Sequence, residues 1–148
     1  GTFQRLLEDF PADCLHETIP DFHNTPMRLR AFERCVAEDA VGRVPSVAEE
    51  IRFLRERSGE ASRLVDLLDE GRLPLRVTHN DTKLNNVMID EATGEGICVI
   101  DLDTVMPGLA LYDFGDMVRT STSPAKEDEQ DLSLVTMRMS YFEALARG

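Results

Sequence analysis

The sequence lacks any apolar run that approaches a membrane span, which takes about 20 residues. Its first five residues, Gly1 to Arg5, have neither the charged start nor the apolar core of a signal peptide. They also lack an initiator methionine, so we expect a processed product or a fragment of a longer protein. At 148 residues, the chain is expected to form one soluble, cytoplasmic domain over residues 1–148.

Positive charge is scarce. The chain has 16 Lys and Arg against 28 Asp and Glu, which gives a formal net charge of −12. Nucleic acids and anionic membranes require a basic face, so neither is expected as a partner. The acidity fits a cationic substrate or Mg²⁺ sites, although acidity more often reflects simple solubility. The oligomeric state stays open.

Cysteine is rare and unpaired in pattern. Cys14, Cys35 and Cys98 are odd in number and form no C-x-x-C motif. We therefore expect a reducing compartment and no disulfide framework. Cys14 and His16 lie close together, but no second ligand pair follows at zinc spacing, so a zinc site is not expected.

What the sequence does contain is helical periodicity over residues 1–71. We expect a first helix that Pro11 ends, and a second that Thr25 caps and that closes near Gly42. A capping box at residues 46–49 would start a third helix, and Gly71 would end a fourth.

After Gly71 the pattern changes to short β-branched runs, with strands expected around Val77 and at 87–89 and 97–100. Residues 75–104 are expected to hold these strands and the loops between them, where the catalytic and metal-binding candidates described next are found, and residues 109–148 are expected to be helical again around a polar loop at 121–130. The predicted fold class is α+β, mainly α.

The most informative residues run from His79 to Asn86 (His-Asn-Asp-Thr-Lys-Leu-Asn-Asn), followed by Asp101-Leu102-Asp103. If the strands at 87–89 and 97–100 pair as a hairpin, Asn86 and Asp101 lie side by side at its open end. An amide oxygen and a carboxylate are hard ligands that suit Mg²⁺. Asp81 lies on the adjoining loop.

This arrangement is what phosphoryl transfer requires. A carboxylate such as Asp81 positions the attacking hydroxyl, while a bound metal neutralises the charge of the transferring phosphate. Lys83 would add a positive charge near the same phosphate. Simpler interpretations stay open, in which Asp81 is a turn residue, Asp101 caps a strand end and Lys83 is solvated.

The stretch resembles the catalytic loop of the aminoglycoside phosphotransferase and choline kinase superfamily, which is related to protein kinases. His79, Asp81, Lys83 and Asn86 also have the spacing of the protein-kinase loop, and Asp101 stands where that family has the aspartate of D-F-G. Leu102-Asp103 replaces Phe-Gly, as in small-molecule kinases. Within the superfamily, residues 77–119 are most similar to N-acetylhexosamine 1-kinases.

The resemblance implies a role for each residue of the two motifs. Asp81 would be the catalytic base or would orient the hydroxyl, and Lys83 would face the γ-phosphate of ATP. Asn86 and Asp101 would hold Mg²⁺, while Asp103 would assist the metal or contact substrate. His79 would support the loop.

Two residues further on carry alternative interpretations. Asp113, in Tyr-Asp-Phe-Gly-Asp, would brace the backbone by resemblance, or would cap the following helix. Arg119 would contact a sugar hydroxyl or phosphate, or would be an ordinary surface arginine.

A kinase also needs a glycine-rich loop and a strand lysine that grip ATP. No G-x-G-x-x-G occurs here, and Lys83 and Lys126 are the only lysines. We therefore expect the C-terminal lobe of a protein-kinase-like fold without the N-terminal ATP-gripping lobe, and we expect this chain alone not to turn over ATP.

The motifs and the resemblance together imply part of a small-molecule kinase whose parent transfers the γ-phosphate of ATP to a hydroxyl, and the resemblance implies an N-acetylhexosamine or related sugar as acceptor. An aminoglycoside, choline or homoserine is the alternative acceptor. A pseudokinase or binding module without catalysis is the alternative of another class.

Overall fold

The computed structural model describes all residues from 1 to 148, in two compact units. The first unit contains residues 1–19 and 75–148, and the second contains residues 20–74. The helices of residues 20–74 make their contacts mainly among themselves, and the single domain over residues 1–148 stays a prediction. The structure is α+β and mainly helical, as predicted. None of its helices combines the length and the apolar character that crossing a membrane requires.

The second unit is built from three α-helices joined by 3₁₀ turns: α2 (Thr25–Glu38), α3 (Ala48–Glu56) and α4 (Arg63–Asp69). Asn24 caps α2, because its side chain accepts a hydrogen bond from the backbone N–H of Met27. The prediction that Thr25 is the cap was therefore wrong by one residue. The helix ends at Glu38 with Asp39 in the left-handed conformation, earlier than the predicted stop near Gly42.

The capping box predicted at residues 46–49 does not form. Ser46 lies inside a 3₁₀ turn, Val44–Val47, and its hydroxyl donates to the carbonyl of Arg43 at 2.8 Å. A cap needs an extended backbone, which the turn denies to Ser46. The prediction for Gly71 is confirmed, since this residue follows the end of α4 with a φ of +69°.

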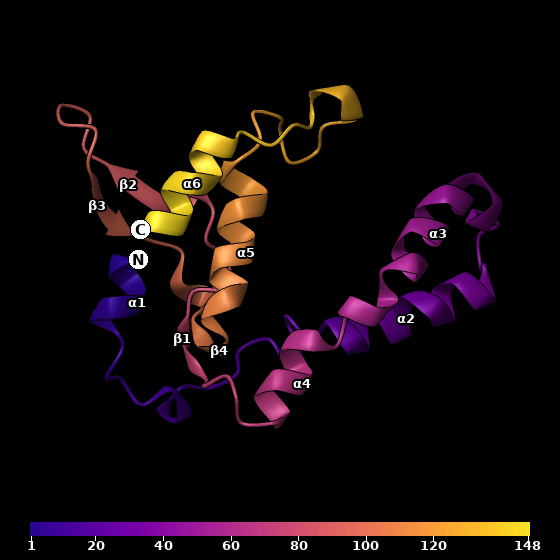
Figure 1. Ribbon diagram of the computed structural model, residues 1–148, viewed down its shortest axis with the longest axis horizontal. Helices are drawn as coiled ribbons and strands as arrows, with labels where there is room; N and C mark the ends of the chain where they lie inside the picture. Colours follow the sequence, from indigo (N-terminus) through magenta and orange to yellow (C-terminus); the bar gives the residue numbers. More distant parts are fainter. The chain divides into compact units, whose positions relative to one another are not determined.

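The first unit contains α1, α5, α6 and four short strands (Figure 1). Their bounds are α1 (Thr2–Leu6), β1 (Arg76–Thr78), β2 (Val87–Ile89), β3 (Gly96–Val99), β4 (Met106–Gly108), α5 (Ala110–Ser121) and α6 (Met139–Arg147). Helix α1 is shorter than the predicted segment ending at Pro11, and α6 starts later than the predicted helix from Leu132. Residues 7–10 and 132–138, which were predicted to belong to these two helices, therefore contain no α-helix.

The strands form two antiparallel pairs. In the predicted hairpin, Val87 pairs with Val99 and Met88 with Cys98, and a bulge follows. The second pair joins β1 to β4, with Thr78 opposite Met106. Strand β4 was not predicted, and this pairing brings the chain after Asp103 back onto the strand that leads into His79 (Figure 1).

The interior of the first unit is unusually polar. Its buried apolar side chains are Val77, Met106 and Leu109, and they are joined by six buried polar ones: Thr78, His79, Asn80, Asn86, Asp113 and Thr122. Buried polar groups need hydrogen-bond partners, and every buried side-chain N and O atom has one. The centre of the unit is therefore a hydrogen-bonded network around the loop that follows β1.

Candidate active site

The loop after β1 is held by its backbone. The carboxylate of Asp113, on the first turn of α5, accepts hydrogen bonds from the N–H of His79 at 3.1 Å and of Asn80 at 2.8 Å. Asp113 is only 2% exposed, and it lies within α5 while Leu109 is the N-cap residue. The alternative that Asp113 caps this helix was wrong. Its contacts with His79 and Asn80 brace the loop instead.

His79 connects two loops through one ring. Its Nδ1 accepts from the N–H of Asp81 at 3.3 Å, so Nε2 carries the proton and donates to the carbonyl of Ile100 at 3.0 Å. Ile100 directly precedes Asp101. The imidazole thereby fixes the distance between the loop of Asp81 and the strand end that carries Asp101.

Three further side chains, none of them among the predicted site residues, complete the support. Thr104 donates to the carbonyl of His79 at 2.6 Å, and Asn80 donates to the carbonyl of Thr104 at 2.9 Å. Thr82 donates to the carbonyl of Asp113 at 2.7 Å. Asn80 and Thr82 stand inside the recognised motif, but nothing in the sequence distinguishes Thr104.

Asp81 is in direct contact with both Lys83 and Asn86. Lys83 Nζ lies 2.7 Å from Asp81 Oδ2, and Asn86 Nδ2 donates to the same oxygen at 3.0 Å and to the Asp81 carbonyl at 2.9 Å. Burial raises the pKa of Asp81, but the hydrogen bonds from Lys83 and Asn86 and the charge of Lys83 outweigh it and leave the pKa below its usual value. The hydrogen bond to Asp81 raises the pKa of Lys83. Both groups are therefore charged at neutral pH.

The hairpin brings Asn86 next to the strand end that leads to Asp101, as predicted. The N–H of Ile100 donates to the carbonyl of Asn86 at 2.9 Å, so Asp101 follows this rung immediately. Asp101 is exposed and adopts a left-handed backbone with a φ of 61°. Few residues other than glycine accept that conformation, and aspartate is one of them.

The oxygens of Asn86 and Asp101 are suitable ligands for Mg²⁺. Because Nδ2 of Asn86 is directed at Asp81, its Oδ1 is the side-chain atom left for a cation. No group of three or more His, Cys, Asp or Glu side chains is placed to hold a metal. Mg²⁺ usually takes one or two protein ligands and fills its other positions with substrate phosphates and water. The chemistry of these two oxygens therefore fits Mg²⁺ that takes its other ligands from phosphate and water.

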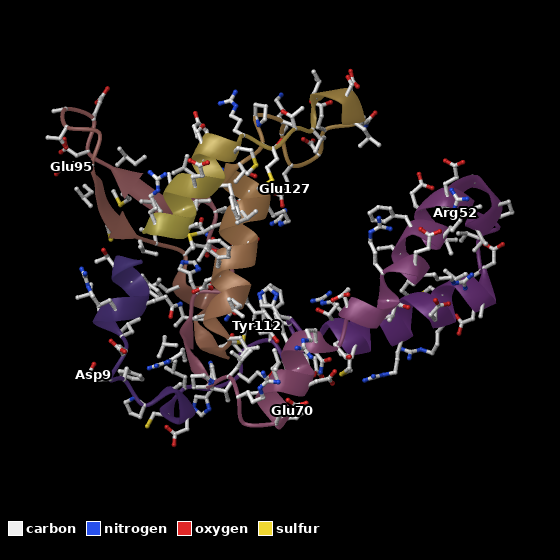
Figure 2. The ribbon with its side chains drawn as sticks, in the orientation of Figure 1. Asp9, Arg52, Glu70, Glu95, Tyr112 and Glu127 are labelled. Carbon is white, nitrogen blue, oxygen red and sulfur yellow. The ribbon has the colours of Figure 1, made fainter.

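The structure does not bring Asp103 and Arg119 into this cluster. Asp103 is exposed in a 3₁₀ turn, Leu102–Thr104, and its carbonyl accepts from Thr18 at 3.1 Å. The guanidinium of Arg119 is 2.9 Å from Asp116 and 3.0 Å from Glu127, and its hydrogen bonds with these carboxylates raise its pKa. Figure 2 shows Glu127 beside α5.

Lys83 and Asn86 hold the carboxylate of Asp81, and a second carboxylate, that of Asp101, lies one hairpin rung away. This arrangement is typical of phosphoryl-transfer sites. A comparison with protein families agrees with this class. The model of the family described as Phosphotransferase enzyme family (APH) matches residues 4–139, which is nearly the whole chain. The chain belongs to this family, and with it to the aminoglycoside phosphotransferase and choline kinase superfamily that its motifs resemble.

Proposed function

We propose that the chain is the C-terminal lobe of a small-molecule kinase, which transfers the γ-phosphate of ATP to a hydroxyl of its acceptor. The observation that carries the proposal is the Asp81 carboxylate, held by Lys83 at 2.7 Å and by Asn86 at 3.0 Å beside the strand end of Asp101. Membership of a phosphotransferase family supports the same chemistry.

Asp81 has the role of orienting the acceptor hydroxyl and receiving its proton. The hydroxyl oxygen attacks the γ-phosphorus as the bond from that phosphorus to the β,γ-bridging oxygen breaks, and the hydroxyl proton passes to Asp81. With its pKa held down, Asp81 is a weak base, which suits a loose transition state that needs orientation more than proton abstraction.

Lys83 has the role of facing the transferring phosphate, since its ammonium lies on the same side of the loop as Asp81. Asn86 and Asp101 would hold Mg²⁺, which when bound would neutralise charge on the phosphates. His79 and Asp113 would support the loop without touching the substrate, through the contacts described above.

We propose an N-acetylhexosamine or a related sugar as acceptor, because the motifs within residues 77–119 are most similar to kinases of that class. Asp103 and Arg119 are the residues proposed to contact it. An aminoglycoside, choline or homoserine is the alternative, which the net charge of −12 favours if the acceptor is a cation.

A pseudokinase or binding module is the alternative of another class. Asp81, Asn86 and Asp101 are all present, and Asp81 and Asn86 make the mutual contacts that a working site requires. A degenerate site is expected to have lost at least one of the three. The observations therefore favour an enzyme.

The test is a screen of the full-length protein with ATP and Mg²⁺ against sugars, aminoglycosides, choline and homoserine, followed by Asp81→Asn and Asp81→Ala on the best acceptor. We expect kcat to fall by about 10²-fold or more in both variants, because orientation of the hydroxyl is lost. Glu95→Gln, in the exposed hairpin turn (Figure 2), is the control and is expected to match the wild type. Full activity of both Asp81 variants would falsify the assigned mechanism.

The purified 148-residue chain provides a second measurement. No glycine-rich loop occurs in it, so we expect no ATP turnover from this chain alone under conditions in which the full-length protein is active. Phosphorylation of the acceptor by the isolated chain at a comparable rate would contradict its assignment as one lobe.

A further inference from the structure

Helix α1 contacts the loop of Asp81 through two neighbouring residues. The side-chain amide of Gln4 donates from Nε2 to Asp113 Oδ2 at 2.5 Å. The ring of Phe3 meets the imidazole of His79 edge-on, with centroids 5.9 Å apart and an interplanar angle of 61°. A helix of five residues thus reaches both side chains that hold the catalytic loop.

The contact with Gln4 matters because Asp113 is a buried carboxylate, and Gln4 is one of its three hydrogen-bond donors. Its Oδ1 accepts from the N–H of Asn80, and its Oδ2 accepts from both Gln4 and the N–H of His79. A buried charge requires such donors, and the loss of Gln4 would leave this carboxylate with only two, the backbone N–H groups of His79 and Asn80. Without Gln4, the backbone of the catalytic loop would have to supply all the remaining donors to Asp113.

We propose that Gln4 is a positioning residue for phosphoryl transfer. It sets the orientation of the Asp113 carboxylate, and this carboxylate fixes the two peptide groups that directly precede Asp81. The inference rests on the proposed function for its catalytic consequence, but the contact between Gln4 and the loop stands on the structure alone.

The surroundings of the pair contain few competing charges. Gln4 and Asp113 line a cavity of about 200 Å³, whose walls also include Phe3, Val87, Val99 and Met117. The one cationic side chain on these walls is Lys83, which is paired with Asp81. The titratable ring of His79 is bonded through both nitrogens. The next acidic residue on α5, Asp116, is bound by Arg119.

Two variants of Gln4 separate positioning from general stability. Gln4→Leu removes the donor and puts an apolar side chain of similar bulk in its place. Gln4→Glu is isosteric and places a second carboxylate against Asp113. Two carboxylates in contact cannot both be ionised without repulsion, so one of them keeps a proton up to a raised pKa. While the introduced carboxyl is protonated it can donate to Asp113 as the amide does, whereas its ionised form cannot.

The sign of the pH effect follows from this. The folded-state pKa of the introduced carboxyl lies above its unfolded value, so the native contact is complete at low pH and is lost as the pH rises through the folded value. We expect the ratio of the kcat of Gln4→Glu to the kcat of the wild type, measured at the same pH, to decline as the pH is raised above about 5. For Gln4→Leu we expect kcat to fall by about tenfold to 100-fold with the KM for ATP almost unchanged.

The experiment measures kcat and KM across pH in the full-length protein, with thermal unfolding at each pH and amide hydrogen exchange of the segment 79–83. Arg5→Gln, the exposed neighbour on α1, is the matched control and is expected to behave as the wild type in all three. In both Gln4 variants we expect faster exchange of residues 79–83, and in Gln4→Glu this should grow with pH.

Unchanged exchange at residues 79–83 and a wild-type pH profile in Gln4→Glu would overturn the inference. A loss of kcat that merely follows the unfolded fraction would also overturn it. If exchange responds as expected while the wild type phosphorylates no acceptor, the proposed function fails and the positioning contact stands.

Discussion

The Nε2 atom of His79 lies 3.0 Å from the carbonyl oxygen of Ile100, the residue before Asp101. The opposite nitrogen of the same ring accepts from the N–H of Asp81 at 3.3 Å. Because the ring is 1% exposed, neither bond competes with water. One rigid side chain therefore sets the separation of the proposed hydroxyl-orienting carboxylate and the proposed metal ligand.

We expect His79→Ala to destabilise the protein by about 2–4 kcal/mol, since it leaves a cavity and an unpaired carbonyl at Ile100. It should also reduce kcat by more than the unfolded fraction explains. Denaturant unfolding and steady-state kinetics of the full-length protein measure the two effects. His16→Ala, at an exposed position, is the control. Stability within about 0.5 kcal/mol of the wild type would contradict the proposed support.

Substitution by alanine is expected to change the stability in opposite directions at two glycines, Gly108 and Gly115. A Cβ added to Gly108 would overlap Thr78 Oγ1 and approach Asn80 Oδ1 at 3.2 Å, whereas a Cβ on Gly115 would meet nothing within 4 Å. We expect Gly108→Ala to cost about 1–3 kcal/mol, because β4 could no longer pack closely on β1. Gly115→Ala, in the middle of α5, should gain about 0.5–1 kcal/mol. Equal unfolding midpoints for the two variants would show that the register of β1 and β4 is wrong.

The pH dependence of activity tests the contact between Asp81 and Lys83. In the wild type the pKa of Asp81 lies below its usual value. The ionised carboxylate therefore contributes its full stability above the usual pKa of aspartate, and this contribution is lost only as the pH falls through the depressed pKa. In Lys83→Met a hydrogen bond and a charge disappear while burial remains, so the pKa of Asp81 rises. We expect the acid limb of kcat against pH to move to higher pH.

Lys126 is the only other lysine of the chain and is exposed, so Lys126→Met is the control for this measurement. Its acid limb should coincide with that of the wild type. A limb that stays in place in Lys83→Met would mean that the residue titrating there is not Asp81.

The concentration of Mg²⁺ required for half-maximal activity tests the assignment of Asp101. Asp101→Asn keeps a side chain that tolerates the left-handed backbone and removes the charge, so we expect the requirement to rise by about tenfold or more with little loss of stability. Asp103→Asn, two residues further on, should change it less, because Asp103 lies outside the cluster of Lys83 and Asp81. An equal rise in both variants would show that Asp103 is also a metal ligand.

The sequence was sufficient for features that short-range rules govern. The hairpin follows from two β-branched runs around a turn, and this alone brings Asn86 to the rung beside Asp101. Helix α5 and the stop at Gly71 follow equally from local patterns. The predictions of helix caps at residues 25 and 46 were wrong because several residues that can form caps lie close together in the sequence. The backbone conformation of the adjoining turn determines which of them caps the helix.

Contacts between distant segments could not be derived in this way. Gln4 and Asp113 are 109 residues apart, and nothing local to either residue indicates that they meet. The same holds for the contact of Thr104 with His79 and for the pairing of β4 with β1. It also holds for Arg119, which was predicted as a possible substrate contact and which forms an ion pair with Glu127.

The sequence by itself determined which chemical groups the candidate site contains, because its acidic, amide and ammonium groups are fixed by residue type and by spacing within one loop and one hairpin. The tertiary structure decided how those groups are held. The orientation of the catalytic loop depends on Asp113, His79 and Gln4, and each of these is set by packing between segments that only the folded chain brings into contact.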